Sequence, residues 1–219
     1  MPRLLFEKVG RSVWMSHLDL MRLFQRAFKR AGLPLTHTQG FNPRPSVSIA
    51  LPLSVGVESV CELLDFDLDC DSISCEEIKE RLNGTLVEGV TVLDVYDTKK
   101  KIRELAYLRC NVTLEYDRGV PDTCVEEIQK LFTREHIFVE KKTKNGIQTQ
   151  DIIPMIQSMD VLHTDENTVI LDAVVCCQNP TLNPALLATA ISNELPQCAP
   201  DFFKSKRMEL FDKNNEIFR

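Results

Sequence analysis

Apolar residues in the first hundred positions recur with two different periods, one typical of strands and one of helices. Alternation or short apolar runs predict four strands, at residues 4–9, 47–51, 60–68 and 90–95. Residues 13–15 are expected to continue or pair with the first strand. Ser16 and Ser74 each precede a stretch with an acidic residue in its first turn and apolar residues at helical spacing, which predicts capped helices over 17–31 and 75–83.

The second half of the chain repeats this pattern. It predicts strands at 109–116, 137–142, 168–177 and 202–211 and helices at 124–134 and 185–195. Thr123 and Asn183 are expected to cap these helices, and Asn145-Gly146 is the strongest hairpin signal in the sequence. Segment 151–160 is ambiguous, because it is apolar enough for a short helix but contains a proline.

The order of these elements predicts the fold class and the domains. Each half reads βαββαβ, so we expect an α+β protein of two tandem ferredoxin-like units, the second with an insertion. The 219 residues suit two domains, expected at 1–98 and 104–219 with a lysine-rich linker between them. No apolar run approaches the roughly 18 residues that span a bilayer. Glu7 and Lys8 interrupt the first apolar stretch too early for a signal peptide, so a cytoplasmic protein without a membrane partner is expected.

Charge is unevenly distributed along the chain. The net charge is −6, yet residues 1–60 hold eight Lys or Arg against three Asp or Glu, a formal charge of +5. The remaining residues hold 18 basic and 29 acidic side chains, a formal charge of −11. A localised basic region on an acidic protein is typical of an anion-binding surface.

The basic residues of the first helix fall on one face. At 100° per residue Arg22, Arg26 and Lys29 lie opposite the apolar stripe, with Arg30 at the margin. Together with Arg44 they are candidate phosphate ligands. The candidates for contact with a base or small substrate are Ser16, Gln39, Phe41 and Asn42. The alternative is a solvated helix face followed by a plain turn that packs Phe41 into the core.

His17, Asp19 and His37 are the candidate catalytic residues. His17 stands in the first turn of a helix, where it could move a proton or contact an anion, or could simply bond to a neighbouring carbonyl. Asp19 could equally be only the acid of the cap. The sole tryptophan, Trp14, is expected in the core. The eight cysteines lack any Cys-x-x-Cys pair, so reduced thiols and no metal site are expected.

Three motifs in order resemble those of a known family. They are Ser16-His17-Leu18-Asp19, Gly40-Phe41-Asn42-Pro43 and the segment 52–59, which reads Pro-Leu-Ser-Val-Gly-Val-Glu-Ser. The sequence is similar here to the radical-SAM-linked domain family, whose members occur fused to or encoded beside radical SAM proteins. The match is clear over residues 1–70, with Arg44 where several relatives carry a histidine. The resemblance implies a radical SAM protein as partner, with the iron–sulfur cluster and S-adenosylmethionine bound by that partner and no cofactor by this chain.

Three functions are compatible with these observations. The first is an accessory or substrate-binding protein for a radical SAM enzyme, not an enzyme on its own, which binds tRNA or rRNA through the basic helix face. The second is a metal-independent endoribonuclease of tandem ferredoxin-like type that uses His17 or His37. The third is a purely protein–protein subunit. After Gly146 the chain has no glycine, so the glycine-rich C-terminal loop of repeat-processing nucleases is missing.

Overall fold

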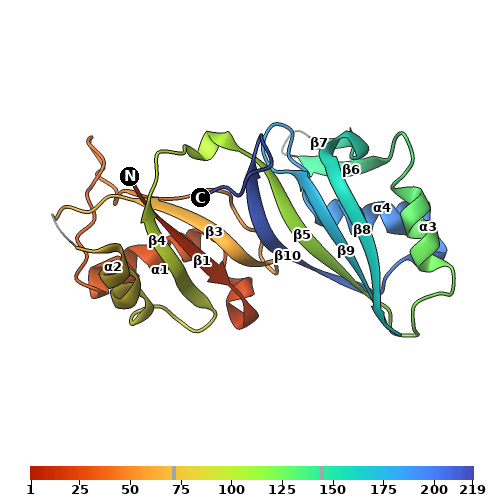
Figure 1. Cartoon of the computed structure of the whole chain (residues 1–219), viewed down its shortest axis with the longest axis horizontal. Helices are drawn as coiled ribbons and strands as arrows, with labels where there is room; N and C mark the ends of the chain where they lie inside the picture. The colour runs from red at the N-terminus through yellow and green to blue at the C-terminus, as the bar shows by residue number, and fades with distance from the viewer. Residues whose placement is uncertain (71–72, 144–145) are drawn as a thin grey trace. The chain divides into compact units, whose positions relative to one another are not determined.

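The structure is a computed structural model that describes residues 1–70, 73–143 and 146–219 (Figure 1). It is a mixed α+β structure with mostly antiparallel sheets. The chain divides into two compact units, unit 1 with Met1–Ile102 and Arg219, and unit 2 with Arg103–Phe218. In the part of the chain that the structure describes, no helix is long and apolar enough to cross a bilayer.

Unit 1 is a small antiparallel sheet with two helices. Its elements are β1 (Pro2–Lys8), η1 (Gly10–Trp14), α1 (His17–Arg30), β2 (Val47–Ile49), β3 (Glu58–Phe66), α2 (Cys75–Asn83) and β4 (Val90–Asp97). Strand β1 pairs with both β4 and β3, and β2 pairs with the other edge of β3, all antiparallel. The strand order within the unit is therefore β4-β1-β3-β2.

The core of unit 1 lies between its sheet and both helices. The apolar stripe of α1 is buried as the sequence predicted, with Phe24 edge-on against Phe6 of β1 at 4.7 Å between ring centroids. Phe28 contacts Phe66 of β3 at 5.0 Å. Leu82 of α2 belongs to the same cluster, so both helices cover one face of the sheet. This packing holds the opposite face of α1 toward solvent.

The segment expected to extend the first strand is instead the 3-10 helix η1. Gly10, with φ +59°, turns the chain out of the sheet, and the N–H groups of Ser12 and Met15 then donate to carbonyls three residues back. Val13 is buried by this turn, whereas Trp14 is 72% exposed. The prediction that Trp14 lies in the core is therefore wrong. The alternation of apolar and polar residues does not reveal that Gly10 has a left-handed backbone conformation.

Unit 2 has a larger antiparallel sheet, two helices and a separate hairpin. Its elements are β5 (Leu105–Glu115), α3 (Cys124–Leu131), β6 (Phe138–Thr143), β7 (Gly146–Asp151), η3 (Ile153–Met155), β8 (Ile156–Asp165), β9 (Thr168–Cys176), α4 (Ala185–Glu194), η4 (Pro196–Cys198) and β10 (Phe202–Asp212). A further 3-10 turn, η2 (Ile102–Glu104), precedes β5. The order is β10-β5-β9-β8, again antiparallel throughout. Among the described residues, strands β6 and β7 pair only with each other.

In unit 2 the structure resolves the ambiguous segment 151–160 and gives helix α3 a different end and cap from those predicted. The ambiguous segment 151–160 contains η3, with Pro154 in its first turn, and the start of the ten-residue strand β8. Helix α3 ends at Leu131, and the Thr123 side chain makes no capping hydrogen bond to it. Asn145 of the predicted hairpin turn lies outside the described residues.

Candidate nucleic-acid interface

Helix α1 separates an apolar face from a basic face. The Ser16 hydroxyl accepts a hydrogen bond from the Asp19 N–H (3.2 Å) and donates one to the Asp19 carboxylate (2.7 Å), which fixes the first turn. This engages Ser16, a predicted base contact, in the helix cap. The four predicted basic residues of the helix are all exposed: Arg22, Arg26, Lys29 and Arg30.

These four side chains differ in how far they are already engaged. Arg22 donates to Asp19 at 3.3 Å, and Arg30 donates to the backbone carbonyl of Thr85 at 2.8 Å. Within the described residues Arg26 and Lys29 have no hydrogen-bond or ion-pair partner. Arg26 and Lys29 are therefore the residues of this face that can bind an external anion without giving up an internal contact.

The Asp19 carboxylate is held in its charged form. The hydrogen bond from the Ser16 hydroxyl lowers the pKa of Asp19, and the nearby Arg22 lowers it further. An ionised Asp19 beside the free N–H groups of the helix start stabilises the helix and competes with any external anion there. The arrangement favours the capping interpretation of Asp19.

Residues 36–45 form an anchored hairpin that carries Arg44 (hairpin 36–45). The Thr36 carbonyl accepts from the Ser46 N–H at 2.8 Å. Further out, the Thr38 N–H donates to the Arg44 carbonyl at 2.8 Å and the Arg44 N–H donates to the Thr38 hydroxyl at 3.0 Å. These cross-links define the backbone up to the tip, and the Arg44 side chain is exposed.

The tip of hairpin 36–45 presents an aromatic ring to solvent. Phe41 is fully exposed, at 101% of its reference area, and Gln39 and Asn42 beside it are exposed as well. The alternative in which this turn packs Phe41 into the core is therefore wrong. The base of the hairpin has a negative charge beside it, because the carboxylate of Asp67 accepts a hydrogen bond from the Ser46 hydroxyl at 3.3 Å.

His17 and His37 lie at opposite ends of the unit 1 sheet. His17 opens α1, close to the end of β1 where Lys8 pairs with Ser59, the second residue of β3. His37 pairs with Pro45 at the base of the hairpin, and this base is bonded to the chain just beyond the other end of β3. Nine strand residues separate the two ends by roughly 27 Å. The two imidazoles therefore do not form one catalytic pair.

The His17 ring is partly buried and lacks the expected carbonyl partner at one nitrogen. Its Nδ1 is buried, with no hydrogen-bond partner in the described part of the chain. Two residues before His17, the Met15 carbonyl accepts a hydrogen bond from the ammonium group of the buried Lys8 at 3.1 Å. The start of α1 is thus a polar environment in which the described residues leave His17 Nδ1 without a hydrogen-bond partner.

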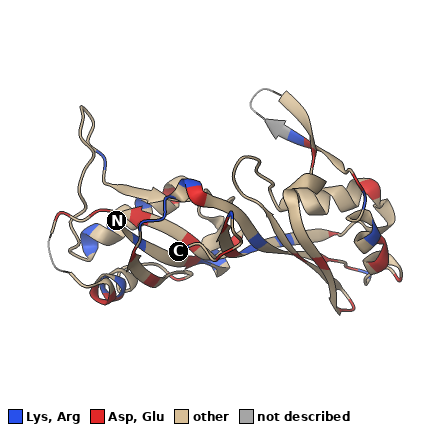
Figure 2. Ribbon diagram, turned by 45° about the horizontal axis from the view of Figure 1, so that its top comes forward, with Lys and Arg blue, Asp and Glu red and all other residues tan. Residues whose placement is uncertain are grey.

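Two of the eight basic residues in the first 60 are structural. Arg3 is fully buried and donates from Nε and Nη2 to the Asp65 carboxylate at 2.6 and 3.1 Å, and Lys8 is 1% exposed. The formal charge of the segment therefore overstates the exposed basic area. Figure 2 shows that Lys and Arg positions are interspersed with Asp and Glu positions along both units.

The cysteines and acidic residues form no recognisable metal site. All eight cysteines are free, and no three His, Cys, Asp or Glu among the described residues are grouped as metal ligands. Burial raises the pKa of Cys110 to about 12 and that of Cys177 to about 11. These thiols remain protonated at neutral pH and are poor nucleophiles.

A model of the family described as "Uncharacterized protein conserved in bacteria (DUF2344)" matches residues 2–184 of the 219-residue chain. The chain belongs to this family. No curated protein matches the sequence.

Solved structures show the same kind of fold as this DUF2344 chain. One is a Cbf5-Nop10-Gar1 complex, with 10% identity, a TM-score of 0.53, and coverage of 95% of this chain and 48% of that one. Another is an H/ACA RNP bound to a substrate RNA containing 2'-deoxyuridine, with 10% identity, a TM-score of 0.50, and coverage of 94% and 46%. The archaeal box H/ACA sRNP Nop10-Cbf5 complex gives the same four values as the second, 10%, 0.50, 94% and 46%. The DUF2344 chain spans about half the length of these matches, and the likeness shows an α+β fold alone.

Sequence reasoning missed an apolar surface beside the start of α1 in this DUF2344 chain. Trp14 is 72% exposed, Leu18 is 65% exposed and Val55 is 53% exposed. Segment 52–59 reaches this surface, because the Gly56 N–H donates to the Val13 carbonyl at 2.9 Å and Gly56 faces the Trp14 ring. The first and third sequence motifs are thus neighbours in space, while the second stands apart on hairpin 36–45.

Proposed function

We propose that the chain binds RNA through unit 1, as an accessory protein that presents RNA to a separate enzyme. The observation that carries the proposal is the exposed, unpartnered pair Arg26 and Lys29 on α1, in the same unit as a hairpin that exposes Phe41 and Arg44. Cations that track phosphates and an aromatic ring that stacks on an unpaired base are the usual elements of single-strand recognition.

The proposed RNA is single-stranded at the contact with hairpin 36–45. A ring that projects from a hairpin tip can reach only a base that has left its helical stack. Gln39 and Asn42, which flank the ring, carry amides that can bond to the edge of such a base. Arg22 and Arg30 would join Arg26 and Lys29 only by exchanging their present contacts for phosphate.

The fold gives this proposal a supporting context. Both units have the strand order expected of ferredoxin-like βαββαβ folds, with the β6–β7 hairpin as an insertion in the second, and we interpret the chain as a tandem of such units. The structures similar to it include one described as bound to a substrate RNA. The resemblance to radical-SAM-linked domains suggests that the enzyme served is a radical SAM protein, which would bind the iron–sulfur cluster and S-adenosylmethionine.

A purely protein–protein role is the second candidate. It is favoured by the exposed Trp14, Leu18 and Val55, an apolar group that an RNA-binding role does not require. An endoribonuclease would have to use His17 or His37 singly, because their placement at opposite ends of the sheet concerns only a mechanism that pairs them.

The test is RNA binding measured over a salt series. Wild type is compared with Arg26→Ala/Lys29→Ala and with a matched double variant, Arg118→Ala/Lys213→Ala, which removes two exposed cations from unit 2. We expect the first variant alone to bind single-stranded RNA about tenfold more weakly and to reduce the salt slope by roughly 1.4, the value for two phosphate contacts. Equal losses in both variants, or none in either, would show that this face does not bind RNA.

A further inference from the structure

Strand β8 is the outermost strand of the unit 2 sheet and leaves a long edge open. Its inner edge pairs with β9 without interruption from Ser158–Val174 to His163–Val169. Among the described residues nothing pairs with its other edge. The outward N–H and C=O groups of an edge strand are a template for another extended chain.

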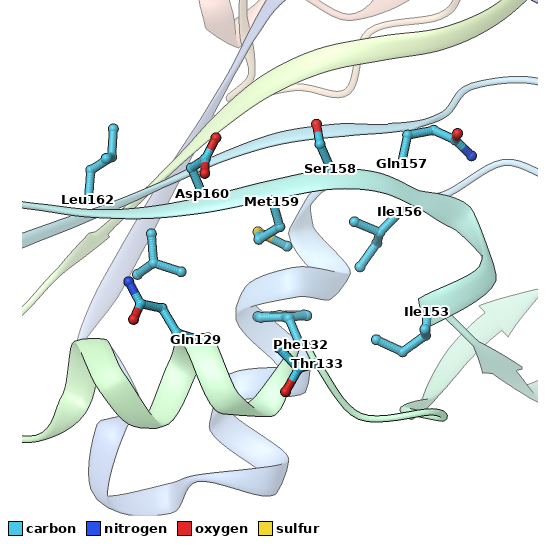
Figure 3. A pocket seen from close by; sticks show the side chains of 11 residues that line it. Gln129, Phe132, Thr133, Ile153, Ile156, Gln157, Ser158, Met159, Asp160 and Leu162 are labelled. Carbon is cyan, nitrogen blue, oxygen red and sulfur yellow. The ribbon is translucent and has the colours of Figure 1, made fainter.

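A groove with a mixed polar and apolar lining runs along this edge. It measures about 490 Å³ and lies between α3 and β8. Figure 3 shows Ile156 and Met159 directed from β8 toward Phe132, the residue that follows α3, with Ile153 at one end of the groove. Ser158 and Asp160 also line it but point to the opposite side of the strand. The groove therefore follows the strand edge itself, where an added strand would place alternate side chains on the two sides.

The corresponding edge of unit 1 is much better shielded. There β2 occupies the same place in the strand order but is three residues long, and prolines precede and follow it at positions 45 and 52. Strand β8 has ten residues and contains no Pro, Lys or Arg, the residues that usually protect an edge. Its register shifts fall near its two ends, so the middle is regular and available for pairing.

Charge on β8 indicates which kind of strand would fit. Asp160 lies opposite Asp172 of β9, and Arg109 of β5 donates to Asp172 through Nε at 2.8 Å. Arg109 forms its ion pair with Asp172 and also interacts electrostatically with Asp160 from farther away, so one cation faces two carboxylates and one negative charge is left in excess. An incoming strand with a Lys or Arg on this side would complete the charge balance.

We propose that β8 binds an extended segment of a partner protein as an added strand. Apolar side chains of that segment would enter the groove beside Phe132 and Met159, and a basic side chain on its other side would lie beside Asp160. A second copy of β8 fits less well, because antiparallel self-pairing across Val161 brings two Asp160 carboxylates near each other. This proposal is independent of RNA binding by unit 1.

The test uses a seven-residue peptide that alternates lysine with valine and leucine. Binding to the full chain is measured by fluorescence anisotropy, and amide hydrogen exchange locates the contact. We expect binding with added protection confined to β8 amides. Asp160→Lys should raise the Kd about tenfold. The matched charge reversal Glu166→Lys, at an exposed residue outside the groove, should change the Kd less than about threefold.

A second peptide separates strand addition from simple charge attraction. N-methylation of every other residue, on the edge that faces β8, removes backbone donors while leaving all side chains unchanged, and we expect it to abolish binding. Equal affinity of the methylated peptide, equal effects of both charge reversals, or no binding of either peptide would overturn the proposal. So would concentration-dependent dimerisation that Asp160→Lys abolishes, since that result assigns the edge to a second copy.

Discussion

The two units have the same strand order and differ in where they place charge. In unit 1 a bidentate pair, Arg3–Asp65, is buried in the sheet, and unpartnered cations stand on the exposed helix face. In unit 2 the comparable bidentate pair, Arg109–Asp172, lies on an exposed sheet face. The two units therefore present different groups, the exposed cations of α1 in unit 1 and the groove beside Asp160 in unit 2.

The two units also differ in the segment that runs from the first helix to the outermost strand. Unit 1 has hairpin 36–45 there, with the fully exposed Phe41, and then the short β2. Unit 2 has the β6–β7 hairpin with the 59% exposed Phe138, and then the long β8. The connection after the first helix is thus where each unit acquires its distinguishing surface, while the order of the strands stays the same.

The largest effect is expected from breaking the two Arg–Asp pairs. Asp65→Ala leaves Arg3 in a buried position without its carboxylate and should lower the free energy of unfolding by about 3 kcal/mol or more. Asp172→Ala should cost less than about 1 kcal/mol, since Arg109 is half exposed and returns to water. Urea unfolding followed by circular dichroism measures both. Similar losses would mean that the two pairs are equivalent despite their different burial.

The contrast between these pairs also shows where sequence reasoning succeeds and fails. Helix α1 was predictable, because its Ser16 cap and the stripe through Phe24 are local patterns. The burial of Arg3 was not, since its partner Asp65 is 62 residues away and becomes a neighbour only when β1 pairs with β3. Strand β8 was obscured by Pro154, which sits in the short helix just before it.

The predicted site residues show the same contrast between what local sequence patterns reveal and what only the fold reveals. Exposure of the α1 cations follows from helical periodicity and is confirmed, although periodicity did not reveal that Arg22 and Arg30 already have partners. The separation of His17 from His37 depends on which end of the sheet each reaches, and no spacing along the chain encodes it. The exposed Trp14 depends on the left-handed turn at Gly10.

Phe41 and Phe138, one exposed phenylalanine from the hairpin of each unit, offer the next comparison. If unit 1 binds RNA, Phe41→Ala should weaken binding of single-stranded RNA by about tenfold, because stacking on one base contributes about 1–3 kcal/mol. Phe138→Ala should leave the affinity unchanged. Neither variant should alter the salt slope, since no charge is lost. Equal affinity of wild type and Phe41→Ala in a fluorescence titration would remove Phe41 from the interface.

Helix α3 differs from α1 and α2 in its cap, while at the start of α4 the Asn183 side chain accepts the Ala185 N–H at 3.1 Å, as the sequence predicted. Ser16 and Ser74 each accept a backbone N–H bond at the start of α1 and α2, so Ser16→Ala and Ser74→Ala should each cost about 1 kcal/mol. Thr123 makes no such bond to α3, and Thr123→Ala should cost less than about 0.5 kcal/mol. The urea midpoints of the three variants provide the measurement. A cost for Thr123→Ala that equals the other two would show that the missing cap bond does not distinguish α3 from α1 and α2.

The smallest effect concerns the pH dependence of α1. The Asp19 carboxylate, bonded to the Ser16 hydroxyl and close to Arg22, has a pKa below its ordinary value of 3.8. A depressed pKa stabilises the folded state above the unfolded-state value, and this contribution is lost as the pH falls through the folded-state pKa. Asp19→Asn should therefore lower the urea midpoint slightly at pH 6, and the difference from wild type should disappear by about pH 2.

Because the same carboxylate holds Arg22, the variant should also free that guanidinium and, if α1 binds RNA, slightly strengthen binding at neutral pH. A difference in stability that persists unchanged at pH 2 would instead show that Asp19 stabilises α1 through its shape and hydrogen bonding and not through its charge.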